Sequence, residues 1–110
     1  MSVEGGQWIP VCRIDEVPVD DVRSFEVEGL PTVAVYSIEG RFYITDDCCT
    51  HEEASLAEGE LDGEVIECPF HGGSFNVITG AVVSRPPRRP LCTYEVRVDG
   101  ETIGLIVPES

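Results

Sequence analysis

Cys49-Thr50-His51 and Cys68-Pro69-Phe70-His71 are two short stretches, separated by residues 52–67, that each combine a thiol with an imidazole. The chain has only two histidines, and both lie in these stretches. Because the ligands of each stretch are close in sequence, few residues have to be ordered to bring them together. The pattern predicts a metal centre held between two loops, with four ligands: Cys49, His51, Cys68 and His71.

Two kinds of metal centre suit two thiolates and two imidazoles. In one class of 2Fe-2S cluster, two cysteines hold one iron and two histidines replace cysteines on the other. Zinc takes the same donor set, but zinc fingers usually pair cysteine with cysteine and carry the histidines on a helix. Each stretch here holds a mixed pair with no good helix after it, which favours iron and sulfide. A zinc-stabilised interaction domain is the non-redox alternative.

The other three cysteines are expected to have no role at the metal. Cys48 neighbours Cys49, but only Cys49 gives the spacing Cys-x-His, so Cys48 is not expected to be a ligand. Cys12 and Cys92 are predicted to be buried, inert thiols. An odd count of five cysteines, no apolar run of ~18 to 20 residues and no export signal in residues 1–5 predict a cytoplasmic protein with reduced thiols.

The net charge of -14, from 21 acidic residues against seven arginines and no lysine, argues against nucleic acid and anionic membranes as partners. Basic protein surfaces fit better. The acidic residues Asp46, Asp47, Glu52 and Glu53 bracket the first stretch, and we expect them to steer it towards basic patches on partners. A solvated acidic loop that only aids solubility is the alternative.

The length of 110 residues predicts one small domain. Short β-branched and aromatic runs cut by glycine, proline and aspartate turns predict an all-β fold, with residues 52–60 as a loop or short turns. Turns at residues 37–41, 78–81 and 98–101 are expected to form hairpins. The expected strands are 7–11, 23–27, 32–38, 41–45, 65–67, 74–76, 81–83, 94–98 and 102–107.

Five aromatic residues are expected in the core of the fold: Trp8, Phe25, Phe42, Tyr43 and Tyr94. Residues 85–90 hold three prolines, which fix φ and remove backbone donors, so this segment is not a central strand. It is either a surface linker, a wall that shields the metal centre or a cationic contact surface. The last alternative arises because the segment also contains Arg85, Arg88 and Arg89.

The chain resembles the Rieske ferredoxins, most closely the soluble ferredoxin components of bacterial aromatic-ring-hydroxylating dioxygenase systems. The resemblance covers nearly the whole chain and extends beyond the ligands. It is carried by residues 49–51, 54–56, 58–59, 66–73, 79–80 and 90–91.

The resemblance implies one domain over residues 1–110, built as a β-sandwich of antiparallel sheets with a small cluster-binding subdomain at about 45–85. It implies one Rieske 2Fe-2S cluster, with Cys49 and Cys68 on the inner iron and His51 and His71 on the outer iron, near solvent. Phe70 and Phe75 are expected to pack beside it and to keep water from the sulfides.

Two departures from respiratory-chain Rieske proteins bear on the chemistry. Those proteins have a disulfide between the two loops, where this chain has Ala54 and Phe70. They also have serine and tyrosine hydroxyls that donate towards the cluster, where this chain has Gly73 and Phe75. Fewer donors in an acidic chain favour the low end of the Rieske range, nearer about -150 mV than about +300 mV.

The implied function is one-electron transfer from an NAD(P)H-dependent flavin reductase to the terminal oxygenase of an aromatic-ring dioxygenase. The chain is therefore expected not to be an enzyme, with no catalytic residues and no direct small-molecule substrate. Three alternatives share the fold: the Rieske domain of a terminal oxygenase, which would continue into a longer catalytic region, a nitrite reductase small subunit and a carrier for a monooxygenase. The sequence leaves the aromatic substrate and the oligomeric state open.

Overall fold

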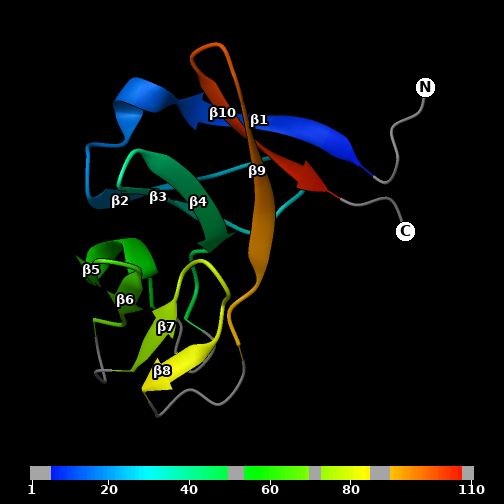
Figure 1. Ribbon diagram of the computed structural model, residues 1–110. Coiled ribbons are helices and arrows are strands. Elements are labelled where there is room, and N and C mark those ends of the chain that lie inside the picture. Colours follow the sequence, from blue (N-terminus) through cyan, green and yellow to red (C-terminus); the bar gives the residue numbers. More distant parts are fainter. Residues whose placement is uncertain (1–5, 50–53, 70–72, 85–89, 108–110) are drawn as a thin grey trace.

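The computed structural model of the chain describes residues 6–49, 54–69, 73–84 and 90–107. Within these residues, ten strands form two antiparallel sheets, one above the other in Figure 1. The large sheet has the strand order β1-β10-β9-β4-β3-β2, and the small sheet has the order β5-β6-β7-β8. No helix among the described residues is long and apolar enough to cross a membrane. The predicted all-β fold is confirmed.

The strands fall close to the predicted ranges, and β6, β7 and β10 match them at both ends. The prediction missed β5, because Gly59 and Gly63 on either side of it favour a loop, and it missed two 3-10 helices, η1 and η2. The elements are β1 Gln7–Arg13, η1 Ile14–Glu16, β2 Asp21–Phe25, β3 Val33–Ile38, β4 Arg41–Asp46, η2 Leu56–Glu58, β5 Glu60–Asp62, β6 Val65–Glu67, β7 Ser74–Asn76, β8 Val82–Ser84, β9 Thr93–Asp99 and β10 Thr102–Val107.

The three predicted hairpins are confirmed as β3–β4, β7–β8 and β9–β10. In the first, Glu39 and Gly40 both have positive φ, 51° and 82°. Two consecutive residues of positive φ are typical of the tight turn whose twist matches that of the flanking strands. At the β1 edge of the large sheet, the two ends of the described chain pair with each other, Gln7 with Val107.

Strand β3 is buried at every position, so it has a core on each of its faces. Because side chains alternate along a strand, Val33 and Val35 face one core and Ala34, Tyr36 and Ile38 face the other. We call these the sheet core and the cysteine core. The sheet core comprises Cys12, Val17, Val27, Val33, Val35, Ile44, Ile103 and Leu105. The cysteine core comprises Val22, Ala34, Tyr36, Ile38, Cys49, Ala54, Leu56, Ile66, Cys68, Phe75, Val77 and Leu91.

Four of the five aromatic residues predicted for the core are partly buried against one of the two cores, but Trp8 is not. Its indole lies over Gly104 on the outer face of the large sheet and donates a hydrogen bond to the Arg97 carbonyl at 2.9 Å. The missing side chain of Gly104 leaves room for the ring, which therefore crosses β10 to reach β9. Among the described aromatic residues, the fully buried ones are Tyr36 and Phe75.

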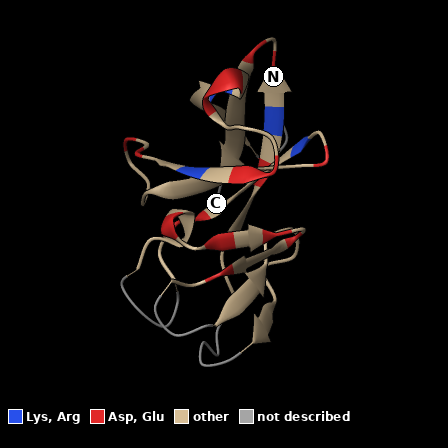
Figure 2. Cartoon of the chain, turned by 90° about the vertical axis from the view of Figure 1, so that its left-hand side faces the viewer, with Lys and Arg blue, Asp and Glu red and all other residues tan. Residues whose placement is uncertain are grey.

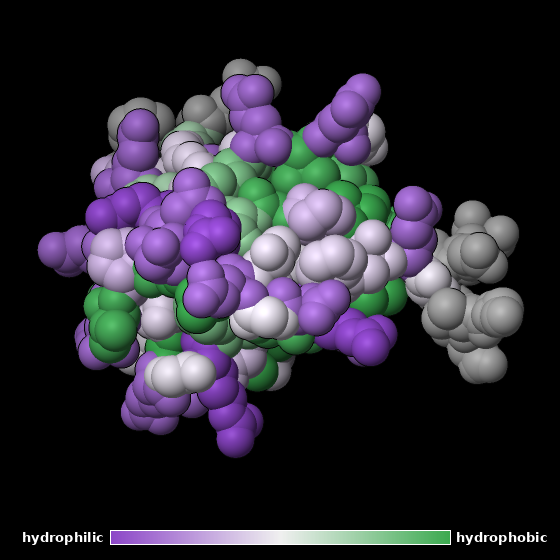
Figure 3. Space-filling model, turned by 90° about the horizontal axis from the view of Figure 1, so that it is seen from above, coloured by the Kyte–Doolittle hydropathy of each residue, from purple (hydrophilic) through white to green (hydrophobic). Residues whose placement is uncertain are grey.

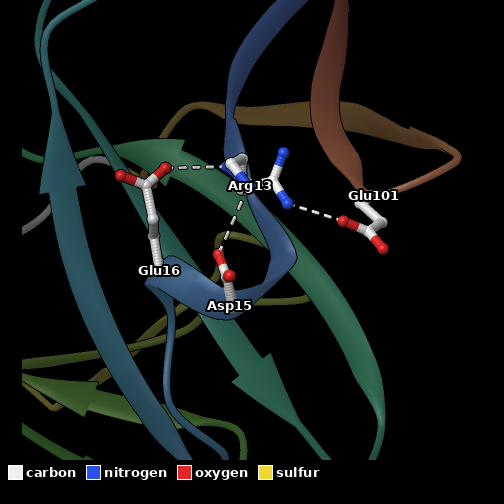
Figure 4. A network of polar contacts seen from close by, with 4 residues as sticks. All are labelled: Arg13, Asp15, Glu16 and Glu101. Atoms are coloured by element: carbon white, nitrogen blue, oxygen red, sulfur yellow. Dashed lines mark hydrogen bonds and ion pairs between the residues drawn. The ribbon is translucent and has the colours of Figure 1, made fainter.

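The described ion pairs all lie in the half of the molecule that holds the large sheet. Arg13 contacts Glu101 at 2.6 Å and Asp15 at 3.6 Å, and its backbone N–H donates to Glu16 (Figure 4). The remaining pair joins Arg23 and Asp21 within β2. Seen from the large-sheet end, hydrophilic residues cover much of the surface, and hydrophobic residues appear in several patches between them (Figure 3). The contacts of Arg13 fix η1 locally, and all of these exposed pairs add little stability.

Candidate metal centre

The two motif cysteines come from different parts of the fold and meet in one buried core. Cys49 lies three residues after the end of β4, and Cys68 directly follows β6. They are 4% and 3% exposed, and both belong to the cysteine core. Their predicted partners, His51 and His71, lie outside the described residues, as does Phe70. The structure therefore brings the thiol half of the predicted ligand set together.

Each cysteine closes its own loop with the same backbone hydrogen bond. The Cys49 N–H donates to the Ala54 carbonyl at 3.0 Å, and the Cys68 N–H donates to the Gly73 carbonyl at 2.7 Å. In both cases the acceptor lies five residues after the cysteine. A backbone hydrogen bond thus closes each loop at the residue that carries the thiol. In the sequence, each histidine follows its cysteine within the closed segment.

The first loop is fixed at its base by Asp47, which is 6% exposed. Its N–H donates to the Thr32 carbonyl at 2.9 Å, and its own carbonyl accepts from the Leu56 N–H at 2.8 Å. Its carboxylate accepts from the Ala57 N–H at 3.0 Å. Steering by Asp47 is therefore a wrong prediction, because its carboxylate points inward to satisfy a backbone donor that the 3-10 turn of η2 leaves without an acceptor.

Of the other three acids predicted to steer partners, Asp46 is half-buried and accepts a 2.6 Å hydrogen bond from the Tyr94 hydroxyl. Burial and this carboxylate raise the pKa of Tyr94. Glu52 and Glu53 lie outside the described residues. Asp46 thus joins β4 to β9 at the point where the chain leaves for the first loop.

The second loop extends the hairpin formed by β6 and β7, whose last paired residues are Glu67 and Ser74. Gly59, at the end of η2, lies directly against this hairpin, so a Cβ at Gly59 would overlap the Glu67 carbonyl. The segment that leaves the first loop is therefore in backbone contact with the residue that precedes Cys68. This contact sets how closely the two loops approach each other.

Phe75 was expected beside the metal centre, and it is fully buried in the same core as Cys49 and Cys68. The prediction missed Tyr36 and Thr45, whose hydroxyls share a buried hydrogen bond of 2.9 Å. Burial raises the pKa of Tyr36. The signal that was available is the unbroken run Val33–Ile38, which is typical of a strand with both faces covered.

The remaining cysteines differ from one another. Cys12 is buried as predicted, and burial together with Glu16 raises its pKa to about 12. Cys92 is exposed, so that prediction is wrong. The alternation that buries Leu91 turns Cys92 outward, while its backbone carbonyl accepts from the Asp46 N–H at 3.0 Å. Cys48 is exposed on the face opposite Cys49.

The family described as the Rieske [2Fe-2S] domain matches residues 7–95, a range that contains both cysteine loops. The chain belongs to this family. The resemblance to Rieske ferredoxins is confirmed, and the cofactor of this Rieske domain is one Rieske-type 2Fe-2S cluster.

Among curated proteins, the chain is similar to "Ferredoxin CarAc" of Metapseudomonas resinovorans, with 48% identity over 86% of this chain and 89% of the relative. It is also similar to the ferredoxin component of a naphthalene 1,2-dioxygenase system of Pseudomonas aeruginosa, with 39% identity over 88% and 92% of the two chains. Among solved structures, the Sphingomonas yanoikuyae B1 ferredoxin has a TM-score of 0.86 and 35% identity, over 94% and 100% of the two chains.

A further similar structure is described as a complex of reduced oxygenase and oxidized ferredoxin in carbazole 1,9a-dioxygenase. The matched chain has a TM-score of 0.85 and 42% identity, over 94% of this chain and 96% of that one. The described residues suit the Rieske cofactor, because two loops closed in the same way bring two soft sulfur donors into one apolar core.

Proposed function

We propose that Cys49 and Cys68 hold the inner iron of the cluster and that His51 and His71 hold the outer iron. The proposal is supported by the burial of both thiols in one core and by the sequence, in which each histidine falls within the segment that its cysteine's hydrogen bond closes. On this view, residues 1–110 form one domain with its cluster-binding part at about 45–85. When bound, the cluster accepts and releases one electron.

The chain itself would hold the cysteines rigid and keep water from their sulfurs with Phe75, Leu56 and Ile66. Low exposure of the thiolates and few hydroxyl donors favour the oxidised state. We therefore keep the expectation of a midpoint nearer about -150 mV than about +300 mV. Dye-mediated titration measures it, and a midpoint well above zero would contradict the proposal.

Adjacent cysteines provide a matched test of the ligand assignment. Cys49→Ser should abolish the visible spectrum and the bound iron, whereas Cys48→Ser should retain both, because Cys48 faces away from the cysteine core. Iron analysis and electron paramagnetic resonance of the reduced protein are the measurements. Iron that survives in Cys49→Ser but not in Cys48→Ser would reverse the assignment.

The chain is an electron carrier, and we propose that it links an NAD(P)H-dependent flavin reductase to the terminal oxygenase of an aromatic-ring dioxygenase in the cytoplasm. The observation that carries this is its similarity, over nearly full length, to ferredoxin components of such systems. It would transform no substrate, so both hydride removal and oxygen activation would take place on its partners. A likeness to a nitrite reductase small subunit, at 19% identity, concerns the fold alone.

An acidic surface beside the second cysteine supports a basic docking partner. Glu58, Glu60 and Glu67 line a hollow of about 320 Å³ together with Cys68 and Pro69. Figure 2 shows acidic residues on this part of the molecule, and the described ion pairs all lie elsewhere. These carboxylates therefore remain available to attract arginine or lysine side chains.

Reconstitution tests the proposed function. Product formation from an aromatic substrate by purified reductase and oxygenase should depend on this protein, and it should slow as ionic strength rises. The Cys49→Ser protein is the control, since it should support no turnover. Electron delivery to a nitrite reductase, with none to dioxygenase components, would favour the alternative instead.

A further inference from the structure

We propose that the buried carboxylate of Asp47 lowers the reduction potential of the cluster through its negative charge. The inference rests on the proposed cluster site. Asp47 is 6% exposed, which is unusual for a carboxylate, and it lies two residues before Cys49.

The side chains of Asp47 and Cys49 lie on the same face of an extended segment. Cys48, between them, forms a bridge with Ser55 and is exposed, while both of its neighbours are buried. Alternation in an extended chain puts residues two apart on one face, at a separation of about 7 Å. The carboxylate therefore faces the same buried interior as the thiol.

No described cation neutralises this charge. The ion pairs among the described residues use Arg13 and Arg23, which belong to the large-sheet half of the molecule. Among the described residues, the carboxylate accepts from a neutral donor, the Ala57 N–H at 3.0 Å. A buried charge is screened by solvent far less than an exposed one. An added electron is therefore repelled more by Asp47 than by the exposed acids nearby.

The hydrogen-bonding role of Asp47 can be separated from its charge. Asp47→Asn keeps an oxygen that accepts from the Ala57 N–H but removes the charge, while the backbone bonds to Thr32 and Leu56 do not depend on the side chain. Glu60→Gln is the matched control, because it removes one charge from an exposed position on β5. Both variants change the net charge equally.

The test is a dye-mediated redox titration of the purified, iron-loaded proteins, with iron content and the reduced-state spectrum measured in parallel. We expect Asp47→Asn to keep parental iron and spectrum and to raise the equilibrium constant for one-electron reduction about tenfold, or about 59 mV. Glu60→Gln should change it by less than about twofold, because solvent screens its charge.

If the midpoint potential of Asp47→Asn shifts no more than that of Glu60→Gln, the inference is overturned. Asp47 would then only stabilise the base of the first loop through its hydrogen bonds. If Asp47→Asn does not retain iron, Asp47→Ser is measured in its place, as a second neutral acceptor. Loss of iron in both, with normal iron in Glu60→Gln, also overturns the inference. A parent protein without a mixed cysteine and histidine spectrum would instead refute the proposed site.

Discussion

The two cores of this protein share β3 but are assembled differently. Six of the eight residues of the sheet core lie on strands of the large sheet and enter it by simple alternation, and the other two, Val17 and Val27, lie in connections next to β2. The cysteine core takes much of its content from irregular segments, including Ala54 in a loop, Leu56 in a 3-10 helix and Leu91 ahead of β9. Long strands therefore stabilise one compartment, whereas the other depends on loop closures, one glycine contact and its cofactor.

The largest effect should come from truncating a fully buried side chain in each core. Phe75→Ala and Leu105→Ala each remove a side chain that is 0% exposed, so each should cost about 3 to 5 kcal/mol of unfolding free energy. Only Phe75→Ala should also speed the loss of visible absorbance, since Phe75 lies with the cysteines. Urea unfolding and bleaching kinetics measure the two effects. Equal bleaching rates would mean that the cores are not independent.

A smaller loss should follow from Gly59→Ala, where a Cβ would overlap the Glu67 carbonyl. We expect a cost of about 3 kcal/mol and weaker iron retention, because the overlapped atom is backbone and cannot turn aside. Gly63→Ala is the control: it has open space around it and a φ of 62°, so it should cost only about 1 kcal/mol. Similar iron retention in both variants would argue against loop spacing as the cause.

Tyr94→Phe should weaken the connection between the large sheet and the first loop and so lower the free energy of unfolding. This change removes the 2.6 Å hydrogen bond to Asp46 and should cost about 1.5 kcal/mol, the low end for a hydrogen bond to a charged group. Tyr43→Phe is matched, because the Tyr43 hydroxyl bonds to none of the described residues. Thermal unfolding compares them, and an equal loss in both would show that the bond contributes nothing.

The smallest effect should appear at high pH and in the sheet core alone. The pKa of Cys12 is raised from its ordinary value of 9.0 to about 12, so its neutral thiol contributes stability below about pH 9 that is lost as pH rises towards 12. At pH 10 the loss should be about 1 kcal/mol greater in the parent than in Cys12→Ala. Parallel unfolding curves for the two proteins between pH 8 and pH 10 would refute this.

The difference between the cores also explains how much could be predicted. Alternation and glycine turns locate the strands of the large sheet and the three hairpins, and the spacing of Cys49, His51, Cys68 and His71 predicts the family. Neither of these sequence patterns predicts which tertiary contacts a single residue makes. The inward turn of Asp47, the exposure of Cys92 and the position of Trp8 over Gly104 depend on which backbone groups need partners once the sheets have formed.

Gln7 and Val107 are paired neighbours on β1 and β10, in the half of the molecule away from the small sheet (Figure 1). Attachment at either end would therefore leave the cysteine loops unobstructed. Tethering to an electrode, or genetic fusion to a reductase, should preserve electron exchange at the far end. Circular permutation is also a reasonable design, because proteins whose chain ends lie close together tolerate it. A short linker would join the two ends, and the new ends would lie at the Glu39–Gly40 turn.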